Sequence, residues 1–163
     1  MLETCSDLMR RAYDAEFITV RDGNISVAWH DRDHFWITPS GIRKPDLQPN
    51  MWKKIDKATG KSLEYTDISA NLYPSGELPL HWGLQKNLPH NEECRVVVHL
   101  HPTYTVAAMH RGLVLEDLVN HFPELGRLSY GPIINVGRTL ITGSPLSLKA
   151  SWIRCCASNL DVM

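Results

Sequence analysis

The sequence lacks an apolar run that approaches the ~20 residues of a membrane-spanning helix. It also lacks an excess of charge of either sign, because its formal net charge is −1 at pH 7. This balance gives no support for a nucleic-acid partner or a membrane-surface partner. The amino-terminal stretch contains Glu3 and Asp7 and no apolar segment, which is not the pattern of a secretory signal peptide.

Cysteine is scarce and has no framework spacing. The four cysteines are Cys5, Cys94, Cys155 and Cys156. The last two are adjacent, and we do not expect them to bridge each other. A reduced, cytoplasmic protein is the simplest expectation from this pattern.

The composition is that of a globular protein. Of the 163 residues, 43% are hydrophobic and 21% are charged, which argues against disorder. The chain has no internal repeat, linker or low-complexity segment. We therefore expect one domain over residues 1–163, long enough for a substantial core.

Hydrophobic periodicity and turn residues predict alternating helices and strands. Helices are expected at residues 3–16, 103–110, 115–120 and 146–154, and a further helix from an N-cap at Ser75 to about residue 87. Strands are expected at 25–29, 35–38, 51–56, 95–101 and 132–136. The polar stretch 30–33 is expected to close a hairpin between the first two strands. The loose alternation predicts a layered α/β domain.

The predicted strand 95–101 ends in two histidines. Because strand side chains alternate between faces, His99 and His101 lie on one face with Cα atoms roughly 7 Å apart. Two neutral imidazole nitrogens that converge on one ion are how histidines hold Zn²⁺ or a similar metal. The alternative is a pair of polar residues on a solvated strand face.

Three loops carry residues that suit an anion. The segment 22–26 pairs glycine with asparagine, which tolerate positive φ and can turn backbone N–H groups inward. The segment 38–41 combines hydroxyl groups with proline and glycine, and the segment 74–77 lies at a predicted helix start. Each of these loops can also be an ordinary turn, which is the favoured interpretation of the segment 22–26 taken alone.

Glu77 and His81 lie four residues apart and would share one helix face. Glu77 can be an acid that complements the helix dipole, or a carboxylate that binds a metal or moves a proton. For His81 the favoured interpretation is a partly buried histidine that is hydrogen-bonded to the backbone.

The order of these motifs resembles that of the class II aldolase/adducin family. The chain carries Gly-Asn-Ile-Ser, Thr-Pro-Ser-Gly, Ser-x-Glu with histidine four residues on, and His-x-His-Pro, and the resemblance covers about residues 5–145. It implies a three-layer α/β/α fold around a largely antiparallel central sheet, usually assembled as a homotetramer.

The resemblance also implies the site. Enzymatic members of the family act on sugar phosphates with a divalent metal, commonly Zn²⁺. By resemblance, His99, His101 and Glu77 are metal ligands, and Glu77 also serves as general base. The residues that match the phosphate pocket are Gly23, Asn24, Ser40, Gly41 and Ser75.

The function expected from the resemblance is a metal-dependent lyase of the aldolase type, which cleaves a small sugar phosphate through an enediolate. A sugar-phosphate epimerase or dehydratase on the same fold is the close alternative, because these reactions share the enediolate. A non-catalytic, adducin-like domain is the second class of function. The retained His99, His101 and Glu77 favour an enzyme over this class.

The chain departs from the family pattern at two places. Sugar-phosphate aldolases usually have a second serine where this chain has Gly76, which keeps the backbone donor and loses the hydroxyl. The third histidine of the family lies beyond a segment like 143–144, whereas the last histidine here is His121. We therefore expect a chain that lacks the usual carboxy-terminal part, or a divergent short member.

Overall fold

The computed structural model describes residues 1–87 and 93–111. Its helices are α1 (Leu2–Asp14), α2 (Asp67–Ala70), α3 (Leu78–Gln85) and α4 (Thr103–His110), with 3-10 turns η1 (Lys44–Asp46) and η2 (Pro49–Met51), and its strands are β1 (Asn24–Trp29), β2 (His34–Ile37), β3 (Lys53–Asp56), β4 (Ser62–Leu63) and β5 (Cys94–His99). The elements predicted at 115–120, 132–136 and 146–154 lie outside the described residues. All other predicted helices and strands are present.

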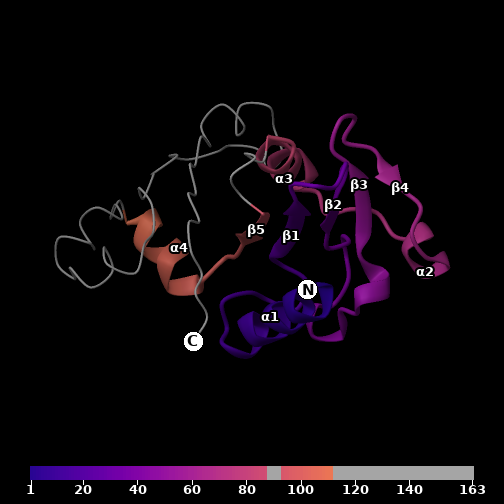
Figure 1. The fold of residues 1–163 in the computed structure, drawn as a ribbon. Coiled ribbons are helices and arrows are strands. Elements are labelled where there is room, and N and C mark those ends of the chain that lie inside the picture. Colours follow the sequence, from indigo (N-terminus) through magenta and orange to yellow (C-terminus); the bar gives the residue numbers. More distant parts are fainter. Residues whose placement is uncertain (88–92, 112–163) are drawn as a thin grey trace, which may run out of the picture.

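The strands form one antiparallel sheet in the order β4-β3-β2-β1-β5 (Figure 1). The register pairs Ser26 of β1 with Ile37 of β2 on one side and with Val97 of β5 on the other. At the end of the same ladder, Asn24 lies opposite His99. The beginning of β1 therefore lies beside the end of β5, although the two are far apart in the sequence.

Helix α1 covers one face of the sheet. Its apolar stripe packs with alternate residues of β1 and with a buried tryptophan into one core. The buried members are Cys5, Met9, Ala12, Ile18, Ile25, Val27, Leu47 and Trp52. Because β1 contributes every second residue to this core, its other residues point to the opposite face.

Helix α3 covers that opposite face (Figure 1). Ala28, Phe35, Ile37 and Ile55 are buried there, and Leu78 and Trp82 pack against them. The two helices and the sheet between them form three layers, which confirms the predicted α/β/α fold with an antiparallel sheet.

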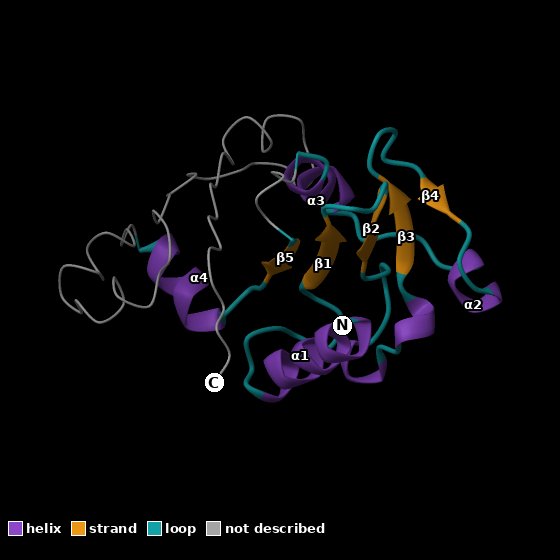
Figure 2. Cartoon of the chain, in the orientation of Figure 1, coloured by secondary structure: helices purple, strands orange, loops and turns teal. Residues whose placement is uncertain are grey.

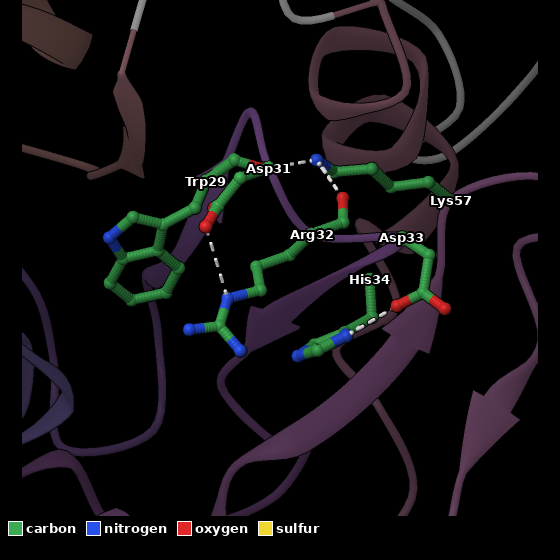
Figure 3. A network of polar contacts seen from close by, with 6 residues as sticks. All are labelled: Trp29, Asp31, Arg32, Asp33, His34 and Lys57. Atoms are coloured by element: carbon green, nitrogen blue, oxygen red, sulfur yellow. Dashed lines mark hydrogen bonds and ion pairs between the residues drawn. The ribbon is translucent and has the colours of Figure 1, made fainter.

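The hairpin between β1 and β2 is tied to the end of β3 (Figure 3). The Lys57 ammonium donates to the carbonyl oxygens of Trp29 and Arg32, and the Lys57 N–H donates to the Asp33 carbonyl at 2.8 Å. The predicted turn at 30–33 is confirmed, and these bonds hold its backbone against the next strand.

Three predicted boundaries were wrong. The strand predicted at 95–101 ends at His99, because its partner Asn24 is the first residue of β1 and offers no further ladder. Ser75 is not the N-cap, since α3 begins at Leu78 and Glu77 holds the cap position. The third strand begins at Lys53, after the 3-10 turn that contains Met51. Within residues 1–87 and 93–111, no helix is long and apolar enough to cross a membrane.

Candidate active site

A pocket opens at the end of the sheet where β1 begins and β2 and β5 end. It is lined by residues 21–24, 39–41 and 75–77, together with Lys44, His99 and His101. The loop before β1 and the loop after β2 leave the sheet at this same end (Figure 2). All residues that the sequence predicted for the metal and phosphate sites therefore line one pocket.

The two histidines of β5 meet at their ring nitrogens. His99 Nε2 and His101 Nε2 are 2.5 Å apart, and the rings lie at 73° to each other with centroids 4.6 Å apart. Burial, and after it the charge of His101, lowers the pKa of His99, which favours the neutral ring that binds a metal. His101 reaches this position although it lies past the end of the strand.

This pair fits two positions of a tetrahedral metal site. A zinc ion that binds each nitrogen at about 2.0–2.1 Å would hold them roughly 3.3 Å apart, so the rings need to separate by less than about 1 Å. Among the described residues, no three His, Cys, Asp or Glu side chains lie close enough to hold a metal ion. The histidine pair and Glu77 line the same pocket without forming a three-ligand cluster.

Glu77 is buried at the start of α3, with 8% of its surface exposed. Burial raises the pKa of its carboxyl group, and the charge of His101 partly opposes this rise. Its side chain makes no capping hydrogen bond to α3. The N-cap position of Glu77 is compatible with the predicted alternative, an acid that complements the helix dipole, although the side chain makes no capping bond.

The loop before β1 approaches the strand closely at Gly23. Its φ is +69°, and a Cβ atom there would lie 2.7 Å from Ile18 Cγ2 and 3.1 Å from the His99 carbonyl oxygen. Only glycine fits this left-handed position without displacing its neighbours. The glycine thus allows Asn24 to pair directly with His99.

The other two loops are joined to each other. The Ser40 N–H donates to the Tyr73 carbonyl at 2.8 Å, and the Ser75 N–H donates to the Thr38 carbonyl at 3.1 Å. The Thr38 hydroxyl accepts the Ile25 N–H at 3.2 Å, so it serves the fold of β1. These bonds hold both loops beside β1 at the pocket.

His81 differs from its prediction in two ways. It is completely buried, and its partners are side chains instead of backbone: Nδ1 lies 2.6 Å from Ser26 Oγ, and Nε2 is hydrogen-bonded to Asn24 Oδ1. Burial, with a smaller effect from the charge of His99, lowers the pKa of His81 to about 3. Both ring nitrogens are engaged, so His81 is not a metal ligand in this arrangement.

Arg21 and Lys44, which the sequence did not predict as site residues, also line the pocket, as does Asp22 of the predicted loop 22–26. Lys44 is 2% exposed and donates to the carbonyl oxygens of Arg21 at 3.2 Å and Ile42 at 3.1 Å. Burial lowers its pKa, and Asp22 opposes this effect. The sequence does carry a signal for these two basic residues, because Arg21 lies close to Gly23 and Lys44 lies close to Gly41, the glycines of two predicted anion loops.

The fold and this pocket define an α/β domain with a pair of histidines beside the three loops that the sequence predicted for an anion. The chain matches the family described as Class II Aldolase and Adducin N-terminal domain over residues 3–135. Because the match covers more than half of the sequence, the chain belongs to the class II aldolase/adducin family. Members of this family generally use a divalent metal, typically zinc, and act on phosphorylated sugars.

Two curated relatives share the name methylthioribulose-1-phosphate dehydratase. The protein from Zygosaccharomyces rouxii is 33% identical over 73 residues, which cover 45% of this chain and 29% of that protein. The protein from Leptospira biflexa is 30% identical over 101 residues, which cover 61% of this chain and 46% of that protein. The chain therefore matches less than half the length of these relatives.

A solved structure shares the fold. YgbL of Escherichia coli, described as a putative aldolase/epimerase/decarboxylase, superposes with a TM-score of 0.53 at 26% identity. The alignment covers 65% of this chain and 46% of that chain. This similarity supports the α/β arrangement that positions the pocket.

Proposed function

We propose that this chain forms the metal- and phosphate-binding part of a divalent-metal-dependent lyase that acts on a small sugar phosphate. The observation that carries the proposal is the single pocket in which two converging imidazole nitrogens lie beside three loops suited to an anion. Separate turns on a solvated surface would not bring these features together.

His99 and His101 would hold the metal, most simply Zn²⁺, through their Nε2 atoms. When bound, the metal supplies Lewis-acid stabilisation of negative charge on the substrate oxygen next to the reacting carbon. Burial lowers the pKa of His99, which favours the neutral ring that binds a metal. His99 is placed by β5, where its backbone pairs with Asn24.

Glu77 would act as the proton-transfer group. Its raised pKa brings the carboxylate closer to the working pH, where a general base transfers protons most effectively. Its oxygens are not occupied by a helix cap, so they are available to take a proton from the substrate. The electron pair left behind forms the enediolate.

The phosphate of the substrate would bind at Gly23, Asn24, Ser40, Gly41 and Ser75. Glycine at 41 has a φ of +73° and an open space where a side chain would stand, so a ligand oxygen can approach its backbone. At Gly76 an added Cβ would also meet open space. Binding the anion there orients the reacting carbons towards the histidine pair.

The names of the two relatives support dehydration as the reaction, since both are called methylthioribulose-1-phosphate dehydratase. In dehydration the enediolate expels a neighbouring hydroxyl, which would take the proton back from Glu77 and leave as water. In the aldol cleavage expected from the sequence, a carbon–carbon bond breaks instead and yields the same kind of intermediate. Family members are often oligomers, and a homotetramer is part of this proposal.

The test is metal analysis and product analysis of the full chain. We expect about one zinc per chain after equilibration, and loss of that zinc in His99→Ala but not in His30→Ala, a surface control on the hairpin. With methylthioribulose 1-phosphate or another ketose 1-phosphate, dehydration yields one product lighter by a water, and aldol cleavage yields two fragments. Binding of less than about a tenth of an equivalent of metal, unchanged by His99→Ala, would contradict the proposal and favour an adducin-like domain.

A further inference from the structure

A row of buried polar side chains joins α3 to the pocket end of β1. Gln85 Nε2 lies 2.8 Å from Ser26 Oγ, Ser26 Oγ lies 2.6 Å from His81 Nδ1, and His81 Nε2 contacts Asn24 Oδ1. Gln85, Ser26 and His81 are completely buried, and Asn24 is 7% exposed. Polar groups in such a place cost free energy unless their hydrogen bonds are made, so the order of donors and acceptors is constrained.

The donors can be assigned along the row. Asn24 Oδ1 can only accept, so His81 Nε2 carries the proton. Nδ1 of a neutral ring is then an acceptor, and the Ser26 hydroxyl donates to it while accepting from the Gln85 amide. The low pKa of His81 agrees with this neutral ring. The Nε2–H tautomer of His81 is consistent with all three contacts of the row, while Gln85 Oε1 is buried without a hydrogen-bond partner among the described residues.

The same arrangement of His81 and Asn24 leaves the amide nitrogen of Asn24 for the pocket. With Oδ1 held against His81, the two N–H donors of Nδ2 are the part of the amide left for the pocket that Asn24 lines. The flipped amide would place Nδ2–H against Nε2–H, and two donors would face each other. A group that needs donors at this point is an oxyanion.

We propose that His81 is a positioning residue that holds the Asn24 amide with its NH₂ group towards the bound oxyanion of the substrate. This role rests on the proposed phosphate site, because it gives that site a fixed donor. Asn24 alone could rotate by 180° and present its oxygen, which repels an anion. His81 removes that orientation through its Nε2–H and acts without touching the substrate.

The experiment uses the full chain and inorganic phosphate as the probe, with affinity measured by NMR titration of the backbone N–H signals of Gly23, Ser40 and Gly41, which every variant retains. Asn24→Ala is expected to weaken binding about tenfold, the effect of one hydrogen bond to a charged group. His81→Phe, of similar volume, is expected to weaken binding about as much. Gln85→Met is the matched control, because it breaks a bond of the same buried row and leaves the His81–Asn24 contact intact.

The double variant separates positioning from general loosening. If His81 acts through Asn24, then Asn24→Ala/His81→Phe binds phosphate within about twofold of Asn24→Ala alone. His81→Gln restores an N–H donor and is expected to recover most of the affinity, which keeps the test valid if His81→Phe does not fold. In the wild type, ring-nitrogen NMR shifts are expected to report the Nε2–H tautomer.

Two failures are distinguishable. Suppose that Asn24→Ala weakens phosphate binding, whereas His81→Phe and Gln85→Met both leave the affinity nearly unchanged. The positioning role of His81 is then overturned, and the phosphate site stands. An Nδ1–H tautomer of His81 in the wild type would overturn it as well. If the wild type does not bind phosphate, the proposed phosphate site and the positioning role are both wrong.

Discussion

The two faces of β1 are built from neighbouring residues yet have opposite chemistry. Towards α1, Ile25 and Val27 join an apolar core, whereas towards α3, Asn24 and Ser26 are buried with His81. The first face gains stability from burial of apolar surface. On the second face, polar side chains are buried at the pocket end of the strand, and their hydrogen bonds hold them in one orientation. A single strand thus supports the fold on one face and the site on the other.

The largest loss of stability is expected for Trp52→Ala, on the α1 face. Trp52 is completely buried, and its Nε1–H donates to Ser6 Oγ at 2.9 Å. We expect a loss of about 3–5 kcal/mol in the free energy of unfolding, measured by urea denaturation. Trp82→Ala, a partly buried tryptophan on the α3 face, is expected to cost clearly less. Equal losses would remove the distinction between the faces.

Gly23→Ala tests the point where the α1 core meets the pocket. Alanine at this position would have to adopt the left-handed backbone of Gly23. Its Cβ would also lie 2.7 Å from Ile18 and 3.1 Å from the His99 carbonyl oxygen. We expect a cost of about 2–3 kcal/mol and weaker zinc binding. Gly41→Ala is the matched control, because its φ of +73° brings similar strain but its Cβ meets open space. If both variants lose the same stability, the steric contact at Gly23 contributes nothing.

The pH dependence of stability tests the polar face. Burial lowers the pKa of His81 in the folded protein to about 3, from an ordinary value of 6.5. Between these values the unfolded chain binds more protons, so stability is greatest above pH 6.5 and falls as the pH decreases towards 3. The expected loss from this residue between pH 7 and pH 5 is about 2 kcal/mol. His81→Gln should flatten this part of the profile, and an unchanged profile would argue against a neutral buried His81.

The smallest effect on stability is expected for Glu77→Gln. The carboxyl group makes no capping bond, and the amide removes the cost of burying a charge, so the free energy of unfolding should change by less than about 0.5 kcal/mol. Activity on a ketose 1-phosphate should be lost, since an amide cannot take the proton. Unfolding of this variant at room temperature would show that the acid is structural.

Local patterns predicted much of the fold correctly. The helix Leu2–Asp14, the hairpin of β1 and β2, and strand β5 follow from periodicity and turn residues within a few positions. The errors lie at boundaries such as the end of β5, where the length of the partner strand decides the last ladder pair. The short elements β4 and α2 were missed because a few residues carry too little periodic signal.

The sequence by itself determined the alternation that places Val97 and His99 on one face, the glycine that β1 needs at its start, and the order of motifs typical of the family. Only the tertiary structure decided that Asn24 pairs with His99 and that His81 meets Ser26 and Asn24, 55 and 57 positions away. Such contacts depend on strand register and on how α3 packs across the sheet. Local propensity does not encode these features, because they are selected by burial in the whole fold.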